Sequence, residues 1–314
     1  MRPLVAVLGP TATGKSALGI AIAEKFNGEI VNCDSTAVYR GFDIGTDKVP
    51  FDERRGIPHH LIDIADPTDE YTAAQFARDA AAVINDIHAR GKLPILVGGT
   101  GFYYRALTRG LFPGPGKDAE LRARLERIAG RKGVETLHRM VARVDPASAD
   151  RIQTRDRKRL VRALEVYFQT GKPLTAHFED TVSPLGSDVQ IGAIALRMPA
   201  AWLADRLARR VDAQFEAGLL DEIRALLASG VPPEARPFGG LVYRQAMEHL
   251  RGVRDEAATR TLIAQENRRY ARRQLIWFRK EPNLVWFDGP GTNAEVQDSV
   301  IRELTARDLL FAPP

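Results

Sequence analysis

Residues 9–16 read Gly-Pro-Thr-Ala-Thr-Gly-Lys-Ser, which matches the pattern G-x-x-x-x-G-K-[ST] of a phosphate-binding loop. The apolar run 4–8 precedes this string and the amphipathic segment 17–26 follows it. A strand, a glycine loop and a helix therefore come in the order that the motif needs in order to bind phosphate. We expect an α/β protein whose P-loop NTPase-like parallel sheet is flanked by helices.

The loop predicts a site for a di- or triphosphate. Gly9 and Gly14 let the backbone turn so that its N–H groups point inward, and the helix beginning near Lys15 adds its positive dipole end. Lys15 adds a full charge, and the Ser16 hydroxyl can bind a Mg²⁺ ion that bridges two phosphates. A glycine-rich turn without a ligand is the alternative. The predicted phosphate-binding residues are Gly9, Pro10, Thr11, Ala12, Thr13, Gly14, Lys15 and Ser16.

Two polar residues follow other predicted strands. Asp34 ends a strand predicted over 29–34, and Thr100 follows the buried run 93–97 within a glycine turn. Ligands of open α/β sheets bind beyond the carboxyl ends of the strands, so we expect both side chains near the phosphate loop. A carboxylate there can hold magnesium through water or take a proton from a nucleophile. Capping the following turn is its structural alternative.

A helical, basic segment interrupts this pattern. The string Pro113-Gly114-Pro115-Gly116 breaks any regular element, and helical periodicity then continues to about Thr170. Residues 117–172 hold 15 Lys and Arg against 8 Asp and Glu, whereas the whole chain has a net charge of +5. Such a local surplus is typical of nucleic-acid binding, and an exposed charged helix face is the alternative. We therefore predict a catalytic core of residues 1–112 and 188–314, and a basic helical insertion over 113–187.

The remaining periodicity predicts further elements. Adjacent strand residues point to opposite faces, so His59 and His60 are interpreted as structural or surface residues and not as a metal site. Arg206 and Arg210 share a helix face, where they can clamp phosphates or simply be exposed. The expected strands cover 59–64, 189–196 and 284–287, and the expected helices cover 71–90, 202–227 with a break near Gly218, a segment from Tyr243, and 259–280.

Composition excludes several classes. The single cysteine, Cys33, rules out a disulfide framework and a cysteine-rich zinc site. No apolar run approaches the roughly 20 residues that span a bilayer. Met1-Arg2-Pro3 leads directly into the first strand, which leaves no room for a signal peptide. We expect a cytoplasmic monomer that does not bind membranes.

Several strings together resemble the tRNA dimethylallyltransferase family in its bacterial form. They run in family order over nearly the whole chain, and their combination is far more specific than the phosphate loop alone. Besides residues 9–16 they are Asp34-Ser35, Val-Tyr-Arg-Gly at 38–41, Asp-Ile-Gly-Thr at 43–46, Leu-Val-Gly-Gly-Thr at 96–100, Arg-Ala-Leu-Glu-Val-Tyr at 162–167, Thr-Gly-Lys-Pro-Leu at 170–174, Gly-Leu-Leu-Asp-Glu at 218–222, and residues 270–279. The chain departs from the family at 241–244, where Val242 replaces a glycine.

The resemblance implies transfer of a dimethylallyl group from its diphosphate to the exocyclic amino nitrogen of the adenosine just 3′ of the tRNA anticodon. It implies that Asp34 accepts the proton, that Thr100 aligns the reactants, and that Arg210 joins the loop and Mg²⁺ on the diphosphate. The tRNA anticodon stem-loop is the implied partner. The implied tRNA contacts are Asp34, Ser35, Thr36, Ala37, Thr100, Arg122, Lys158, Arg159, Leu160, Val161 and Arg162.

Three alternatives remain open. An adenylate isopentenyltransferase would use the same chemistry on free AMP or ATP, but it would not need a basic insertion of this size. A small-molecule kinase or ATPase would use the same loop for ATP, and Asp34 could then hold its magnesium. A non-catalytic RNA-binding module would leave the phosphate loop unexplained.

Overall fold

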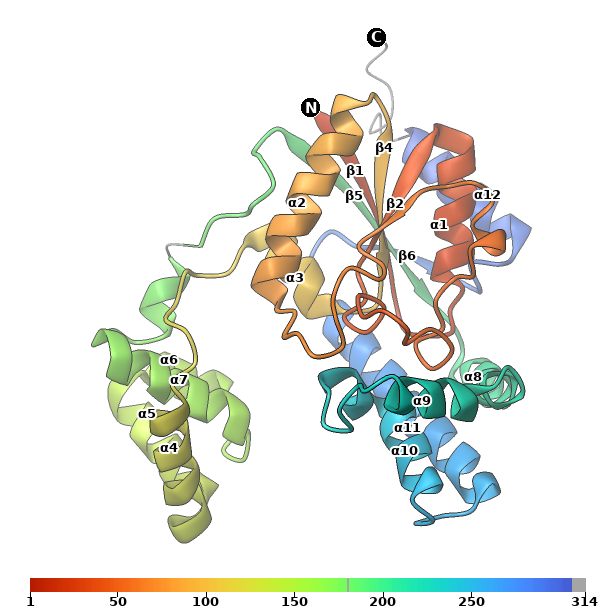
Figure 1. Ribbon diagram of the computed structural model, residues 1–314. Helices are drawn as coiled ribbons and strands as arrows, with labels where there is room; N and C mark the ends of the chain where they lie inside the picture. The colour runs from red at the N-terminus through yellow and green to blue at the C-terminus, as the bar shows by residue number, and fades with distance from the viewer. Residues whose placement is uncertain (180, 307–314) are drawn as a thin grey trace. The chain divides into compact units, whose positions relative to one another are not determined.

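A six-stranded parallel sheet forms the centre of the larger part of the protein (Figure 1). The computed structural model describes residues 1–179 and 181–306. The strand order is β3-β2-β4-β1-β5-β6, and every neighbouring pair is parallel, which confirms the predicted sheet. The strands are β1 (Arg2–Leu8), β2 (Gly28–Asn32), β3 (His59–His60), β4 (Leu93–Gly98), β5 (Val189–Arg197) and β6 (Val285–Asp288).

β1 lies between β4 and β5 and is buried on both faces. Its residue Val5 is paired with Ile95 on one side and with Gly192 on the other. Leu4 and Leu8 pack into one hydrophobic cluster, whereas Val5 and Val7 pack into a second one on the opposite face. A strand covered on both faces needs apolar residues at consecutive positions, which explains the unbroken run from Leu4 to Leu8.

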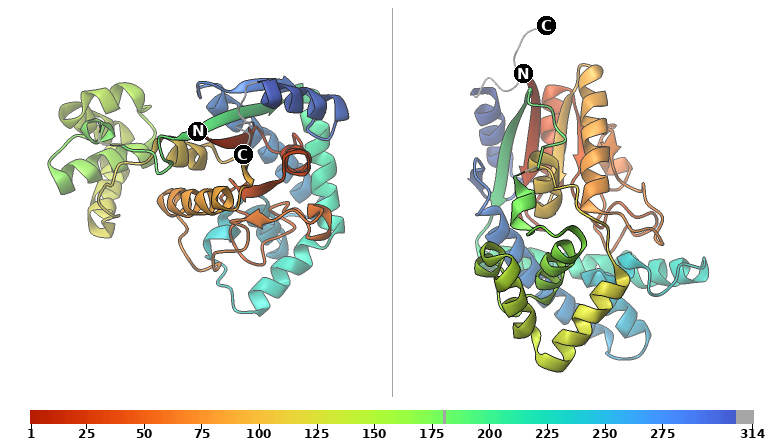
Figure 2. Two further views of the ribbon diagram at one scale, coloured as in Figure 1. Left: turned by 90° about the horizontal axis from the view of Figure 1, so that it is seen from above. Right: turned by 90° about the vertical axis from the view of Figure 1, so that its left-hand side faces the viewer.

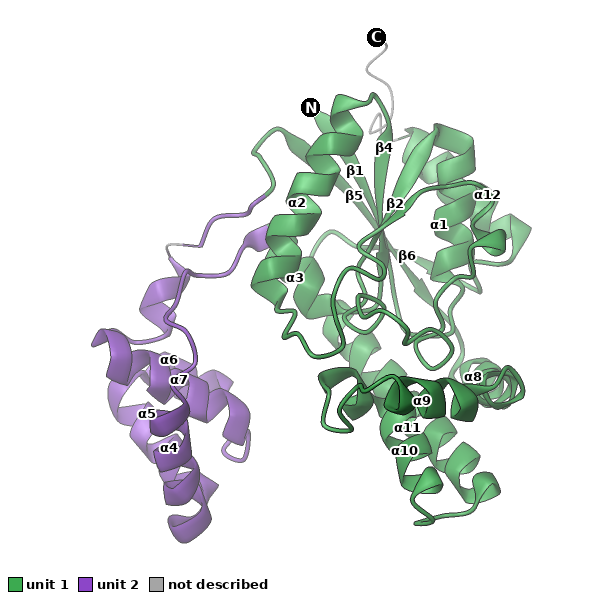
Figure 3. Ribbon diagram, viewed as in Figure 1, with its two compact units in different colours: residues 1–108, 185–314 green, residues 109–184 purple. Residues whose placement is uncertain are grey.

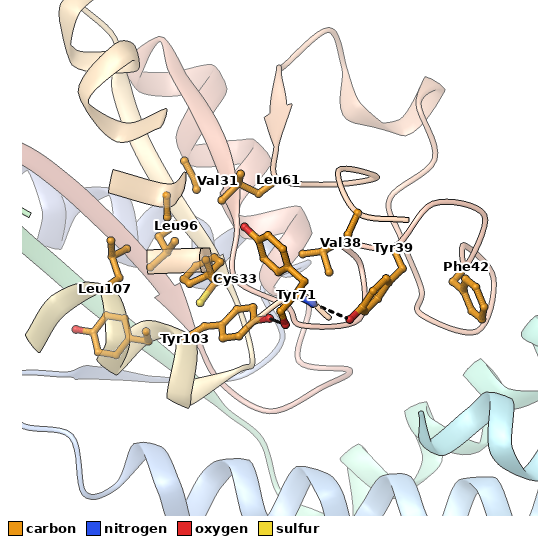
Figure 4. Close-up of a cluster of buried hydrophobic side chains, with 14 of the residues drawn as sticks. Val31, Cys33, Val38, Tyr39, Phe42, Leu61, Tyr71, Leu96, Tyr103 and Leu107 are labelled. Atoms are coloured by element: carbon orange, nitrogen blue, oxygen red, sulfur yellow. Dashed lines mark hydrogen bonds between the residues drawn. The ribbon is translucent and has the colours of Figure 1, made fainter. Parts of the chain in front are cut away.

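Helices cover both faces of the sheet (Figures 1 and 2). α2 (Ala73–Ala89) and α3 (Gly101–Arg109) pack on one face, where the Phe76 and Tyr103 rings stack with centroids 4.2 Å apart. α1 (Lys15–Phe26) and α12 (Ala294–Ala306) cover the other face. Figure 4 shows the first cluster, in which Cys33 lies beside Leu96 and Tyr103. The core therefore fixes the backbone immediately before Asp34.

Four helices lie beyond the carboxyl ends of the strands (Figure 1). They are α8 (Ala200–Glu216), α9 (Leu219–Ala228), α10 (Leu241–Leu250) and α11 (Glu256–Phe278). The predicted break at Gly218 is confirmed, since Gly218 adopts a left-handed φ of 94° between α8 and α9. α8 and α11 pack against each other, and both present polar side chains to the phosphate loop.

A second compact unit is entirely helical and has its own core (Figure 3). It covers residues 109–184, and residues 1–108 and 185–314 form the first unit. These limits lie a few residues before the predicted 113 and 188. Its helices are α4 (Ala119–Lys132), α5 (Val134–Val144), α6 (Pro146–Arg151) and α7 (Arg157–Thr170). The core of this unit contains Leu125, Leu137 and Leu164.

Some predicted elements differ from the structure. The strand predicted over 59–64 is wrong after His60, because Leu61 and Asp63 have left-handed φ values of 60° and 57° that end the extended conformation. The periodicity missed α3, α6 and α12. Three short 3₁₀ helices complete the described fold: Asp52–Arg54, Thr175–Phe178 and Arg236–Gly239. Across residues 1–179 and 181–306, every helix is too short or too polar to cross a bilayer.

Candidate active site

The phosphate loop connects β1 to α1 with a backbone that closely fits its glycines. Gly9 has a φ of 139°, and a Cβ there would lie 2.7 Å from the carbonyl oxygen of Leu196. Gly14 adopts a φ of 81° at the N-cap of α1. Thr13 Oγ1 donates to the Pro10 carbonyl at 2.9 Å and so closes the loop on itself. The loop therefore has the turned backbone that the sequence predicts.

Side chains from two distant helices hold the loop. From α8, Arg206 Nε donates to the Ala12 carbonyl at 3.0 Å and Arg210 Nη1 donates to Thr11 Oγ1 at 2.9 Å. From α11, Gln274 Oε1 accepts the Thr11 backbone N–H at 2.8 Å. A cavity of about 340 Å³ opens here. It is lined by Ala12, Arg206, Arg209 and Arg210. Three guanidinium groups beside a phosphate loop make this a cationic pocket suited to a polyanion.

The surroundings of Lys15 change the pKa of its amino group. Its Nζ donates to the Pro10 carbonyl at 2.6 Å. Burial and, to a smaller extent, the positive charge of Arg210 lower the pKa of Lys15 to about 8, against the opposing effect of the Asp34 and Asp47 carboxylates. An ammonium that is partly desolvated among cations gains much from a bound anion, because the anion restores its charged form. Lys15 is therefore suited to hold a diphosphate.

Asp34 and Thr100 follow β2 and β4, which are neighbours in the sheet. The Thr100 hydroxyl accepts the Ser35 backbone N–H at 3.1 Å, and the Thr100 N–H donates to the Cys33 carbonyl at 3.1 Å. These two hydrogen bonds join the segments, so that the carboxyl and the hydroxyl belong to one rigid group. The Asp34 carboxylate also acts electrostatically on Lys15, and the catalytic roles of Asp34 and Thr100 stay predictions.

The Asp34 carboxylate also has the structural role that the sequence offers as its alternative. Oδ1 accepts the Thr36 N–H at 2.9 Å and the Thr36 hydroxyl at 2.6 Å, which forms the expected turn. Within residues 1–179 and 181–306, Oδ2 accepts no hydrogen bond, so one oxygen shapes the turn and the other can accept a proton. Ala37, by contrast, is only 7% exposed, so its side chain offers little surface to an RNA.

Gln274 belongs to the string 270–279 that contributes to the family resemblance, but the sequence alone assigns it no role. Its side chain is buried, and besides accepting from Thr11 it donates Nε2–H to the Gly99 carbonyl at 2.9 Å. One amide thereby joins the phosphate loop to the turn that carries Thr100. The signal was available in the string 270–279, but periodicity alone does not single out one glutamine of a long helix.

Tyr243 and Glu222 hold the segment Asp-Ile-Gly-Thr at 43–46. Tyr243 donates its hydroxyl to Glu222 Oε1 at 2.6 Å and accepts the Gly45 N–H at 3.0 Å. A Cβ at Gly45 would lie 2.5 Å from the Tyr243 ring, so only glycine fits there. The string 241–244 departs from the family at Val242, but its Tyr243 still positions the segment 43–46 through these contacts.

The second unit contains the predicted tRNA contacts. Its helix α7 carries Glu165, which is fully buried and accepts from Arg122 Nε at 2.7 Å and from Arg162 Nη1 at 2.7 Å. Burial by itself raises the pKa of Glu165, but these hydrogen bonds outweigh it and lower the pKa to about 2. Arg122 and Arg162 therefore form a charged cluster with Glu165, while they remain candidates for RNA contact through their exposed atoms.

The other predicted contacts on α7 separate into two groups. Leu160 and Val161 are 0% and 2% exposed in the core of the second unit. These buried side chains offer little surface to an RNA, because an amphipathic helix turns one face inward, and the tRNA contact of both residues stays a prediction. Lys158 and Arg159 are exposed on the other face, and Arg159 pairs with the neighbouring Asp156 at 3.4 Å. Both stay predicted RNA contacts.

The two neighbouring histidines have structural partners. His60 Nε2 lies 2.7 Å from Glu29 Oε2, and His59 Nδ1 lies 2.8 Å from the Ile57 carbonyl. Glu29 is buried and also pairs with Arg90 and Lys92, so His60 belongs to a buried charged cluster at the start of the sheet. This agrees with the structural interpretation of both residues.

Comparison with known proteins identifies the family. The family model described as IPP transferase matches residues 37–281. The chain is 49% identical over 306 residues to a tRNA dimethylallyltransferase of Solibacter usitatus, covering 95% of this chain and 97% of that one. It is 44% identical over 298 residues to that of Geobacter metallireducens, covering 95% and 96%.

Solved structures agree with this result. The full-length tRNA isopentenylpyrophosphate transferase of Bacillus halodurans superposes with a TM-score of 0.72 at 35% identity, covering 98% of this chain and 97% of that one. A eukaryotic dimethylallyltransferase acting on tRNA gives a TM-score of 0.78 at 28% identity, covering 100% and 81%. The parallel sheet, the phosphate loop and these matches together show that the chain belongs to the IPP transferase family.

Proposed function

We propose that this protein transfers a dimethylallyl group from dimethylallyl diphosphate to the exocyclic amino nitrogen of the adenosine 3′ to the tRNA anticodon. One observation carries the proposal: a cationic phosphate pocket and an Asp34–Thr100 pair lie at neighbouring strand ends and are joined through Gln274. Tight positioning of a donor and an acceptor is what a two-substrate transfer requires. Named relatives with this chemistry support the same activity.

On the donor side, the reaction breaks the bond between the allylic carbon and the diphosphate oxygen. Negative charge develops on the departing diphosphate, and the loop N–H groups, Lys15 and Arg210 are placed to stabilise it. On the acceptor side, the amino nitrogen forms the new bond to carbon and loses one proton. Asp34 takes that proton on Oδ2, while Thr100 hydrogen-bonds the reactants and fixes their alignment.

The residues present fit a magnesium ion. The Ser16 side chain is exposed, and its hydroxyl has no hydrogen-bond partner within residues 1–179 and 181–306, so this oxygen is available to a hard cation. Mg²⁺ usually takes only one or two protein oxygens and completes its shell with phosphates and water. Ser16 would hold the ion directly, and Asp34 could hold it through water. When bound, the ion would neutralise charge on the diphosphate.

The tRNA must present its adenine outside the base stack, because the amino nitrogen is otherwise inaccessible to the pocket. Ser35, Thr36 and Thr100 lie half-buried at the proposed acceptor side. The exposed Lys158 and Arg159 of α7 are proposed to bind backbone phosphates. A monomer in the cytoplasm is the state that we expect for such an enzyme.

The test is the mass of a tRNA anticodon fragment before and after incubation with the protein, Mg²⁺ and dimethylallyl diphosphate. The expected product carries one dimethylallyl group in place of one amino hydrogen. Parallel reactions with AMP as acceptor and with ATP as donor separate the alternatives. Prenylation of AMP but not of tRNA, or phosphoryl transfer from ATP, would contradict the proposal.

A further inference from the structure

Arg210 is already paired with an anion that belongs to the protein. Its Nη1 lies 2.9 Å from Asp47 Oδ2 and 2.9 Å from Thr11 Oγ1 of the phosphate loop. The side chains of Arg210 and Asp47 are 26% and 43% exposed, so the pair lies at the mouth of the site and not in the core. The proposed function assigns Arg210 to the diphosphate, and the following inference depends on that assignment.

The backbone on one side of Asp47 is firmly held. The Asp43 and Ile44 N–H groups donate to Glu222 Oε2 at 3.0 and 2.8 Å, and Gln214 Nε2 donates to the Ile44 carbonyl at 3.1 Å. Asp47 N–H closes the turn by donating to the same carbonyl at 3.1 Å. These contacts come from α8 and α9, so the turn cannot shift without disturbing two helices.

The backbone on the other side of Asp47 is held by Lys48. The Lys48 side chain is only 4% exposed, and its Nζ donates to the Tyr39 carbonyl at 2.6 Å and to the carboxylates of Asp43 and Asp63 at 2.6 and 2.5 Å. Asp47 is thus a short side chain on a fixed turn, whereas Arg210 is a long side chain on a helix. When the pair separates, Arg210 is the partner that can move.

We propose that Asp47 competes with the diphosphate for Arg210. It pairs with Arg210 in the substrate-free enzyme and thereby lowers the affinity of the site for the diphosphate. A dianion entering the pocket must share or replace Asp47 as the partner of Arg210, and it is repelled by the Asp47 carboxylate. Both effects lower the affinity for the departing product as well as for the substrate. Asp47 is therefore a positioning residue that limits how tightly the product is retained.

The charge of Asp47 also reaches Lys15. Asp47 acts on Lys15 as well as on Arg210, since its carboxylate is one of the two that raise the pKa of Lys15 against burial and Arg210. The negative charge of Asp47 is therefore felt by both cations that are proposed to bind the diphosphate. Its removal would free Arg210 for the ligand, but it would also lower the pKa of Lys15, so the binding test belongs at a pH well below 8, where Lys15 stays charged.

The test compares the full-length wild-type protein with Asp47→Asn, using titration calorimetry with inorganic diphosphate and Mg²⁺. Asparagine tolerates the left-handed φ of 60° at this position, so the turn is kept while the charge is lost. We expect the variant to bind diphosphate about tenfold more tightly, as expected for removing one like charge a few ångströms from a polyanion. In steady-state kinetics, KM for dimethylallyl diphosphate should fall with it, while affinity for tRNA stays unchanged.

Asp205→Asn is the matched control. Asp205 pairs with Arg209 at 3.4 Å and is 77% exposed, and Arg209 lines the same cavity as Arg210. This substitution removes the same charge from a pair whose arginine is 74% exposed, so solvent screens its effect on a bound anion and binding should change by less than about twofold. Thermal unfolding of each variant checks that the fold is retained.

The outcomes separate the inference from the proposed function. If wild type binds diphosphate and Asp47→Asn binds it equally or more weakly, the competitor role is refuted and the transferase proposal stands. If wild type fails to bind diphosphate at all, both are refuted. Tighter binding by Asp47→Asn, with Asp205→Asn unchanged, supports the inference.

Discussion

At the residue scale, the two oxygens of Asp34 allow its two roles to be tested separately. Oδ1 shapes the turn through Thr36, and Oδ2 is the proposed proton acceptor. Asp34→Asn keeps an oxygen for the turn but removes the basic group. We expect kcat to fall by about 10²–10⁴-fold with little change in tRNA affinity. Single-turnover prenylation and a tRNA binding assay measure both quantities, and activity within a few-fold of wild type would place the base elsewhere.

Lys15 gives a pH-dependent prediction. The free protein loses the Lys15 charge as the pH rises through about 8, and a bound diphosphate favours the charged form. Affinity for diphosphate should therefore fall by up to about tenfold per pH unit above 8, with proton uptake on binding. Calorimetry in buffers of different ionisation enthalpy measures that uptake. Equal affinity at pH 7.5 and 9.5 would contradict it.

The lowered pKa of Lys15 also affects the free energy of unfolding, but with the opposite dependence on pH. Because the folded-state pKa of Lys15 lies below that of the unfolded chain, the folded state binds this proton more weakly. Stability from this group is therefore reduced at neutral pH and recovers as the pH rises from about 8 towards the ordinary lysine value of 10.5. At neutral pH, Lys15 therefore lowers the stability of the fold, although its charge favours binding of the diphosphate.

Residues within a local motif could be predicted, and residues that act across the fold could not. The loop, Asp34 and Thr100 follow strands in the sequence, so their positions in a parallel sheet follow from elementary geometry. Gln274 lies 263 positions from its partner Thr11, and no periodicity links the two. The orientation of single residues on a helix was also not predicted. Leu160 lies within a basic string, yet its side chain packs into the core.

At the scale of an element, α7 divides its cations between structure and surface. Lys158 and Arg159 project into solvent, whereas Arg162 is tied to Glu165. Replacing Lys158 and Arg159 together by Ala should weaken tRNA binding and reduce the slope of log K against log salt by about 1.5, as expected for two lost phosphate contacts. Binding measured from low to moderate salt tests this.

A second pair of cations provides the control for α7. Arg131 and Lys132 end α4 and are also exposed, so the double alanine variant removes the same charge from another helix of the same unit. We expect a smaller change in slope for this control. Equal slopes for both double variants would show that the surplus charge acts without a defined contact on α7.

Elements with strong periodicity were predicted well, and short ones were not. α2 and α11 match the predicted 71–90 and 259–280 to within a few residues. α6 is six residues long and depends on its Asp145 cap, which accepts the Ser148 N–H at 3.0 Å. So short a helix shows too few turns for a hydrophobic period to emerge.

At the scale of the whole molecule, the two units have separate cores. Among the described residues, the cluster of the second unit shares no member with the two clusters that flank the sheet. Glu165→Gln leaves Arg122 and Arg162 without their buried partner, which should destabilise the second unit by about 3 kcal/mol. We expect calorimetry to show that only one of two unfolding transitions moves.

The control and the pH dependence for Glu165 follow from its surroundings. Glu135→Gln removes a carboxylate from the solvent-exposed pair with Arg155, so both unfolding transitions should stay where they are in the wild type. Since the folded pKa of Glu165 is lowered to about 2, its contribution is full above the ordinary value of 4.5 and is lost as the pH falls towards 2. A shift of both transitions in Glu165→Gln would mean that the units unfold together.

The distance along the chain between Thr11 and Gln274 has a consequence during synthesis. The ribosome makes the recognisable loop first, whereas the arginines of α8 follow their loop partners by 194 and 199 positions and Gln274 follows Thr11 by 263. A nascent or truncated chain that ends before α8 would contain the phosphate-loop motif without the side chains of α8 and α11 that hold the loop. The motif is therefore made early, and the pocket closes only in a chain that also includes α8 and α11.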